Sequence, residues 1–166
     1  ILTTAIKKGI EKKSVSKEVI KLMSTLNHDL SNVKIKINAC TDVTGYGLLG
    51  HLNEMCNNKN LTALINFNEI PFIESVSDFA LEGTIPGGTK NNLEFYKPNI
   101  LFDETIKDYQ KLMLADAQTS GGLLISTSQK NSKILLDYLN LNSIYKSKVI
   151  GRFIEKKETN IIVNNE

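Results

Sequence analysis

The sequence predicts an α+β fold in which helices pack against a β-sheet. Segments that alternate apolar and polar residues, as strands do, occur along the chain together with segments of helical apolar spacing. The two kinds do not alternate strictly, which favours an α+β fold over a doubly wound sheet. A length of 166 residues suits one domain with a sizeable core, and no repeat, low-complexity tract or linker divides it.

The first part of the chain is expected to form two helices, a strand and a third helix. Residues 2–12 read as the end of a helix, and a second helix over residues 17–30 has Ser16 as its expected cap. Residues 33–41 alternate apolar and polar side chains, which predicts a half-buried strand. Residues 47–57 carry an apolar stripe at helical spacing, which predicts a helix with one buried face.

The second part of the chain is expected to add strands and helices around one loop. Residues 83–92 contain three glycines and one proline, and they are expected to form that loop. The other expected elements are, in order, a strand over residues 61–67, a helix over 72–82, a helix over 104–115, a strand over 122–127, a helix over 130–140 and a closing pair of strands over 147–154 and 159–163.

A carboxylate stands at the turn between the expected strand over residues 33–41 and the helix that follows it. Residues 41–52 read TDVTGYGLLGHL, so that Asp42 comes at the exit of the strand. Gly45 and Gly47 let the backbone approach a ligand without side-chain obstruction. Such an Asp is a candidate metal ligand, and it is equally a candidate helix cap or Asx-turn residue. The pattern by itself leaves both roles open.

Composition and charge exclude several classes of protein. The chain is 41% hydrophobic and 23% charged, and its net charge of +2 is too small to indicate nucleic acid binding. It has no apolar run of membrane-spanning length and no secretory start. Cys40 and Cys56 form no zinc motif, and the simplest interpretation is a reduced cytosolic protein.

The histidines and cysteines are expected to be structural. His51 lies just off the apolar stripe of its helix and is expected to be a hydrogen-bonded packing residue. Cys40 is expected to be a small buried residue. Ser120 is not in the G-x-S-x-G arrangement, and the two histidines, His28 and His51, lack an orienting partner for a triad, so a serine hydrolase is not expected.

Four segments together resemble one enzyme family. Residues 39–52 (ACTDVTGYGLLGHL) resemble the signature of selenophosphate synthetase, also called selenide, water dikinase. Three further segments fit the same family in the same order: residues 2–7 (LTTAIK), 85–89 (IPGGT) and 118–124 (QTSGGLL). The resemblance concerns the family's carboxy-terminal domain, which is shared with aminoimidazole ribonucleotide synthetase. It therefore implies the fold of that domain for this chain, a mixed β-sheet with helices packed against it.

The resemblance covers the chain from residue 2 to about residue 152, with two visible departures. Tyr46 stands where the family usually has Phe, which is conservative. Ala117 follows Asp116 where the family order is Asp-Pro-Gln-Thr, a change that removes no obvious ligand.

The resemblance implies an activity that this chain would share with a missing half. The family makes selenophosphate from ATP, selenide and water, with release of AMP and phosphate. Because the chain begins with Ile1 in the middle of a pattern, we expect residues 1–166 to be a single domain, the carboxy-terminal half of a longer enzyme. The family's reactive Cys or selenocysteine, lysine, glycine-rich loop and most metal carboxylates lie in the amino-terminal half. No catalytic residue is therefore expected here, and the fragment alone is expected to be inactive.

The resemblance also implies ligands and partners for this domain. Asp42 is expected to bind a Mg²⁺ at the ATP polyphosphate site. Partners are expected to be ATP and selenide through the full-length enzyme, the amino-terminal domain and a second copy in a cytoplasmic homodimer, with neither nucleic acid nor membrane. The segments Gly87–Asn92 and Gln118–Gly122 are expected to border the same concave face as Asp42. The residues expected to bind ATP are Gly87, Gly88, Thr89, Asn92, Thr119, Ser120 and Gly121.

Two alternatives to this function stay open. The chain could belong to another ATP-dependent member of the superfamily, such as a purine-pathway synthetase or a hydrogenase-maturation protein. It could also be a non-catalytic scaffold module that kept the fold. For the segment Gly87–Asn92 the alternative is a polar surface turn after Pro86, and for Gln118–Gly122 it is a tight turn between helix and strand.

Overall fold

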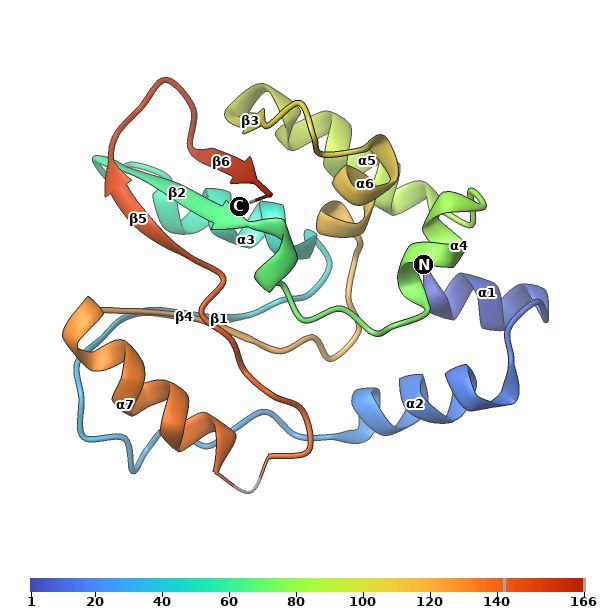
Figure 1. The fold of residues 1–166 in the computed structure, drawn as a ribbon, viewed down its shortest axis with the longest axis horizontal. Helices are drawn as coiled ribbons and strands as arrows, with labels where there is room; N and C mark the ends of the chain where they lie inside the picture. The colour runs from blue at the N-terminus through green and yellow to red at the C-terminus, as the bar shows by residue number, and fades with distance from the viewer. Residues whose placement is uncertain (142, 166) are drawn as a thin grey trace.

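The α+β class is confirmed by the computed structural model, which describes residues 1–141 and 143–165. Helices and strands follow one another without strict alternation (Figure 1). The α-helices are α1 (Leu2–Lys8), α2 (Lys13–Ser24), α3 (Gly47–Cys56), α4 (Val76–Leu81), α5 (Gly87–Tyr96), α6 (Asp108–Ala115) and α7 (Gln129–Asn140). The strands are β1 (Ile37–Asp42), β2 (Leu61–Asn66), β3 (Ile100–Phe102), β4 (Leu123–Thr127), β5 (Gly151–Glu155) and β6 (Ile161–Asn164), and two short 3₁₀ helices are η1 (Phe67–Glu69) and η2 (Lys97–Asn99).

The strands form two separate sheets. The larger sheet is mixed, with the strand order β3-β6-β2-β5. In it β6 runs parallel to both β2 and β3, whereas β5 runs antiparallel to β2. The smaller sheet is an antiparallel pair of β1 and β4, in which Asp42 lies opposite Leu123. Because the two sheets are distinct, the end of β1 lies outside the mixed sheet.

The core lies between the mixed sheet and the helices that cover it. Helix α3 contacts β2 and β6, and α5 and α6 pack against α3 and against each other (Figure 1). The apolar spacing of α3 places its stripe inside, as predicted. Buried side chains in this region are Leu49, Leu52 and Cys56 from α3, Ala63 and Ile65 from β2, Met113 and Leu114 from α6, and Ile161 and Val163 from β6.

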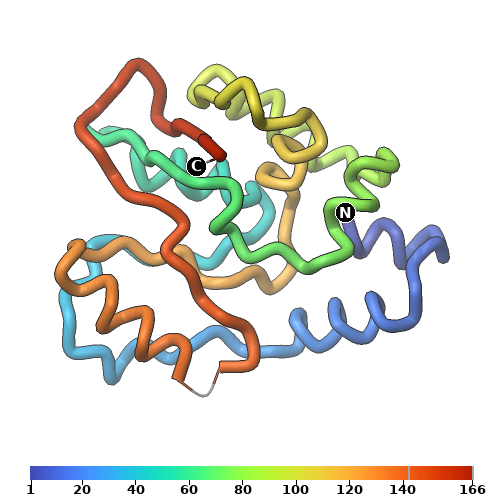
Figure 2. Tube along the Cα trace, in the orientation of Figure 1, coloured from blue at the N-terminus to red at the C-terminus, as the bar shows by residue number. Residues whose placement is uncertain are grey.

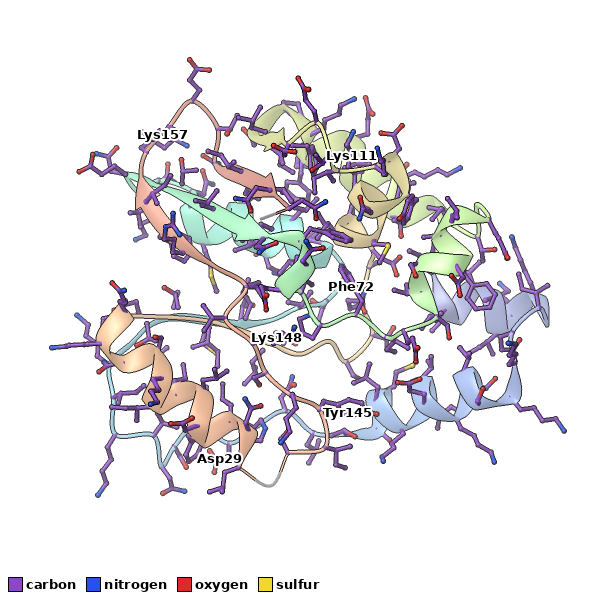
Figure 3. All side chains as sticks on the ribbon, in the orientation of Figure 1. Asp29, Phe72, Lys111, Tyr145, Lys148 and Lys157 are labelled. Atoms are coloured by element: carbon purple, nitrogen blue, oxygen red, sulfur yellow. The ribbon has the colours of Figure 1, made fainter. Side chains whose placement is uncertain are left out.

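The β1–β4 pair lies in the same part of the molecule as α7, and the chain then returns to the mixed sheet. After α7 the chain runs back towards β5 (Figure 2). Tyr138 on α7 donates its hydroxyl to the carbonyl of Asp29 at 2.8 Å, and Asp29 lies beside this helix (Figure 3). Further along, the Lys148 ammonium lies 3.4 Å from Glu69 of η1. These contacts connect α7 and the returning chain to earlier segments.

Two expectations for helices were wrong. Helix α2 begins at Lys13 and ends at Ser24, so Ser16 is inside it and donates to Glu11 Oε1 at 2.7 Å instead of capping the helix. The predicted loop over residues 83–92 becomes helix α5 from Gly87 onward. Glycines are poor helix formers, but packing of the helix outweighs that weak preference. The side chains of α5 that pack inward, at spacings of four and three residues, are Thr89, Leu93 and Tyr96.

Two expectations for strands also differ from the structure. The closing strands do not pair with each other, since β5 and β6 lie on opposite sides of β2. β3 was not predicted, because its three residues are too few for an alternating pattern. Among the residues that the structure describes, no helix has the length and hydropathy of a membrane span.

The loop between β5 and β6 is held by one buried hydroxyl, which allows a test of the fold. Thr62 of β2 is fully buried, donates to the Thr159 carbonyl at 2.7 Å and accepts the Lys157 N–H at 2.9 Å. Thr62→Val keeps the shape and leaves both partners unpaired. We expect it to lower the free energy of unfolding by about 1–3 kcal/mol in urea denaturation.

Thr62→Ser is the matched control, because it keeps the hydroxyl and removes only a methyl group. It should cost less than the valine variant, at about 0.8 kcal/mol for one buried carbon. A valine variant as stable as the serine variant would show that the two hydrogen bonds do not matter.

Candidate functional site

Asp42 is the last residue of β1, and its side chain is exposed. Its neighbour two residues earlier, Cys40, is also exposed, so the expectation that Cys40 is buried was wrong. The strand alternates half-buried and exposed positions, and both residues fall on its exposed side. Partial desolvation, followed by the negative charge of Asp42, raises the pKa of the Cys40 thiol. Cys40 is therefore not an activated nucleophile.

The structure gives no support to Asp42 as a cap or turn former. Two other aspartates show what an Asx turn looks like here. Asp29 accepts the N–H of Ser31 at 2.8 Å, and Asp103 accepts the N–H of Thr105 at 2.9 Å. The pKa of the Asp29 carboxyl is lowered by the Ser31 N–H and then by the Ser31 hydroxyl, and that of Asp103 by the Thr105 hydroxyl and then by the Thr105 N–H. Among the described residues none donates to the Asp42 carboxylate, and the residue before α3 is Tyr46. The carboxylate is free for a ligand.

The backbone after Asp42 is fixed by hydrogen bonds to the Gln118–Gly122 turn. The Val43 N–H donates to the Gly122 carbonyl at 3.0 Å. The Thr44 carbonyl accepts the N–H groups of Gly47 and Gln118, both at 3.0 Å. The segment that carries Asp42 and the turn before β4 therefore lie side by side, while a concave face that both would border with the start of α5 stays a prediction.

The side chain of His51 holds the same segment from the other side. His51 is only 6% exposed, and its Nε2 lies 3.1 Å from the Thr44 backbone nitrogen. Its Nδ1 lies 3.0 Å from Glu54 Oε2. The expectation that His51 is a hydrogen-bonded packing residue is confirmed.

Helix α5 reaches the Asp42 turn through Asn92. Its side-chain amide donates to the carbonyls of Gly45, at 2.8 Å, and Ala115, at 3.1 Å. Thr89, on the same helix, is fully buried and donates its hydroxyl to Asp116 Oδ1 at 2.5 Å. The two polar side chains expected to face phosphate thus point their donors into the protein, where they join elements together.

The glycines at the start of α5 face open space. A Cβ atom at Gly87 or Gly88 would meet no heavy atom within 4 Å, and both residues are exposed. The first N–H groups of an α-helix have no partner within the helix. Gly87 and Gly88 can therefore present backbone N–H groups outward, although they belong to a helix and not to a loop.

The Gln118–Gly122 turn divides into exposed and buried residues. Thr119 and Ser120 are exposed, and Ser120 has a left-handed φ of 54°. Gly121 is buried, and an added Cβ would lie 1.9 Å from the Val43 carbonyl oxygen. Close backbone packing against Val43 therefore requires glycine at this position. Thr119 and Ser120 remain the accessible residues of the turn.

The sequence interpretation missed the structural role of Asp116. Its carboxylate is 7% exposed and accepts the Thr89 hydroxyl at 2.5 Å. Its carbonyl accepts the Gln118 side-chain amide at 2.9 Å. The sequence feature that could have indicated this role is an acidic residue directly after the apolar end of α6, where a buried carboxylate needs hydrogen-bond donors.

Asp42 does not belong to a complete metal site within the described residues. Over residues 1–141 and 143–165, no group of three or more His, Cys, Asp or Glu side chains is placed to hold an ion. Mg²⁺ is commonly bound by one or two carboxylates together with substrate phosphates and water. The free, exposed Asp42 carboxylate fits one such ligand. Two cavities of about 340 and 450 Å³ lie near β3, and Asp42 lines neither of them.

Comparison with known proteins identifies the family. Residues 3–164 match the family described as AIR synthase related protein, C-terminal domain. The chain belongs to this family. The match covers both sheets and all the segments that surround Asp42.

Several similar proteins carry the same name, selenide, water dikinase. The one from Aliarcobacter butzleri is 39% identical over 166 residues, which is 99% of this chain and 48% of that protein. The one from Myxococcus xanthus is 43% identical over 136 residues, 80% of this chain and 39% of that protein. The one from Campylobacter jejuni strain RM1221 is 42% identical over 168 residues, 99% of this chain and 47% of that protein. The resemblance found in the sequence is confirmed, and the chain spans about half the length of the curated relatives it matches.

Two glycines of the Asp42 turn should respond differently to alanine. Gly47 has φ 67°, and a Cβ there would lie 2.7 Å from the Ala115 carbonyl carbon. Gly47→Ala combines left-handed backbone strain with overpacking, so we expect the free energy of unfolding to fall by about 2–4 kcal/mol. Thermal or urea denaturation measures the change.

Gly45→Ala is the control within the same turn. No heavy atom lies within 4 Å of a Cβ added there. We expect a change of less than about 0.5 kcal/mol, as for ordinary surface substitutions. Equal losses for the two variants would contradict the packing described for Gly47.

Proposed function

We propose that this chain is the carboxy-terminal half of a selenide, water dikinase and that it supplies Asp42 to a Mg²⁺ at the ATP polyphosphate site. The observation that carries the proposal is the exposed carboxylate of Asp42, to which no described residue donates, on a turn whose backbone is held by hydrogen bonds from the Gln118–Gly122 turn, His51 and Asn92. The similarity to selenide, water dikinases across 99% of the chain supports the reaction class.

The proposed phosphoryl transfer suits a domain that positions the phosphates and the metal ion and forms no covalent bond with the substrate. Phosphoryl transfer depends mainly on orientation of the phosphates and neutralisation of their charge. A bound Mg²⁺ would supply that neutralisation. In this chain Asp42 would hold the ion, while the outward N–H groups of Gly87 and Gly88 and the hydroxyls of Thr119 and Ser120 are available to phosphate oxygens.

The remaining parts of the proposed enzyme lie outside residues 1–166. They comprise an amino-terminal domain with the reactive Cys or selenocysteine, a lysine, a glycine-rich loop and the other metal carboxylates. The chain's coverage of 47–48% of the Campylobacter and Aliarcobacter relatives leaves room for such a domain. We further propose a homodimeric full-length enzyme in the cytoplasm.

Selenide dependence tests this function. The full-length protein is incubated with ATP and Mg²⁺, with and without selenide, and AMP is measured. We expect AMP only when selenide is present, and no turnover by the 166-residue chain alone. ATP turnover at the same rate with and without selenide would favour the alternative that the protein is another ATP-dependent member of the superfamily. Absence of ATP binding by the full-length protein would favour a scaffold module. ATP turnover by the isolated 166-residue chain would contradict the proposal that the catalytic groups lie in the amino-terminal half.

Asp42→Asn in the full-length protein tests the metal role. Asparagine keeps the shape and one acceptor oxygen but loses the charge that holds a hard cation. We expect selenide-dependent AMP formation to fall by about 100-fold or more, because each 1.36 kcal/mol of lost transition-state stabilisation is about a factor of ten. Excess Mg²⁺ should restore part of the activity.

Stability is expected to stay nearly constant in this variant, since none of the described residues bonds to the Asp42 carboxylate. Asp137→Asn, which removes an exposed carboxylate from α7, is the matched control and should leave the activity unchanged. Retained activity with a lowered melting temperature in Asp42→Asn would rule out the metal role.

A further inference from the structure

We infer that His51 is a positioning residue, which fixes the Asp42 turn by accepting the Thr44 N–H. The inference rests on the proposed role of Asp42 as a ligand, because only then does the geometry of this turn affect the reaction. His51 is on α3 and Asp42 is on β1, so the imidazole connects the helix to the segment that leaves the strand.

The contacts of the imidazole define its protonation. A backbone N–H can only donate to an unprotonated ring nitrogen, so Nε2, at 3.1 Å from the Thr44 nitrogen, carries the lone pair. In the neutral ring the proton is then on Nδ1, which donates to Glu54 Oε2 at 3.0 Å. Glu54 is 55% exposed, so this contact orients the ring and adds little stability. The Tyr46 ring, with its centroid 5.9 Å from that of the imidazole, covers it further.

The hydrogen bond to Thr44 completes the backbone pairing next to Asp42. The Val43 N–H and the Thr44 carbonyl are paired with backbone groups of Gly122, Gly47 and Gln118. For the Thr44 N–H the partner is the His51 side chain. His51 is thus a position where one substitution can release the Thr44 N–H without changing Asp42 or the backbone itself.

A packing role and a positioning role make different predictions. His51→Phe keeps an aromatic ring of similar shape but removes the acceptor. His51→Gln loses the ring, but its side-chain oxygen can accept the Thr44 N–H. If His51 only packs, the phenylalanine variant should be the milder one. If His51 positions Asp42, the glutamine variant should be the milder one.

The experiment measures selenide-dependent AMP formation by the full-length protein as a function of Mg²⁺ concentration. We expect His51→Phe to raise the Mg²⁺ concentration needed for half-maximal activity by about tenfold, the effect of one lost hydrogen bond, and saturating Mg²⁺ to recover most of kcat. His51→Gln should stay within about threefold of the parent protein, since it retains the bond. Asp137→Asn, which removes an exposed carboxylate from α7, is again the control and should leave the Mg²⁺ dependence unchanged.

Two results would overturn the inference. One is a His51→Phe protein that melts at a lower temperature but needs no more Mg²⁺ than the parent. The other is a His51→Gln protein as impaired as His51→Phe. A third measurement does not depend on activity: the ¹⁵N spectrum of the histidines in the full-length protein should show His51 protonated at Nδ1 and unprotonated at Nε2.

That spectrum separates failure of the inference from failure of the proposed function. A parent protein without selenide-dependent activity would contradict the proposed function, whereas the expected tautomer would still support His51 as the group that holds the turn. A proton on Nε2 would contradict the hydrogen bond to Thr44 and with it the inference, whatever the activity.

Discussion

The arrangement around Asp42 depends on the hydrogen bonds that the buried carboxylate of Asp116 accepts. A buried charge is tolerated only when hydrogen bonds replace the lost water. At 7% exposure, Asp116 finds these bonds in the Thr89 hydroxyl of α5, which donates to Oδ1, and in the Gln118 side-chain amide, which lies 3.5 Å from Oδ2. The hydrogen bond from Thr89 to Asp116 therefore fixes the position of α5 against the end of α6.

Two further contacts carry that constraint to the Asp42 turn. Helix α5, once placed by Thr89, brings Asn92 to the Gly45 carbonyl at 2.8 Å. Two residues after Asp116, the Gln118 N–H reaches the Thr44 carbonyl at 3.0 Å. The turn thus receives one bond from a helix and one from the segment before β4, and both depend on where Asp116 lies. Groups that face inward therefore determine the place of a carboxylate that faces outward.

The sequence was informative where the determinants are local. The strand, the turn with Asp42 and the stripe of α3 follow from side-chain spacing within about twenty residues, and the structure has all three. In contrast, the spacing of Thr89, Leu93 and Tyr96 was obscured by the glycines before them. The directions of Thr89 and Asn92 could not be predicted either, because a hydroxyl or amide has the same sequence signature whether it faces phosphate or a buried carbonyl. Each partner lies more than twenty residues away.

The order of the strands in the mixed sheet could not be predicted from the sequence for a related reason. β5 and β6 are close in sequence, which suggests a hairpin, yet each pairs with β2, about ninety residues earlier. Pairing over that separation is decided by the whole core and not by the strands themselves. The same holds for Asp116, whose importance depends on Thr89, 27 residues earlier.

The construction of the Asp42 turn suits its proposed role as one ligand of a shared metal site. A single exposed carboxylate has no need of a partner, because water solvates it at little cost. Its backbone is different: Val43 and Thr44 pair their N–H groups, and Thr44 its carbonyl, within the protein. The order of the turn is therefore established during folding, before any ligand arrives. An ion that takes Asp42 as one ligand then does not have to immobilise the loop, and its binding free energy is not reduced by that ordering. If Asp42 is such a ligand, as we propose, the inward-facing polar groups around it would serve to hold its backbone in place before the ion binds.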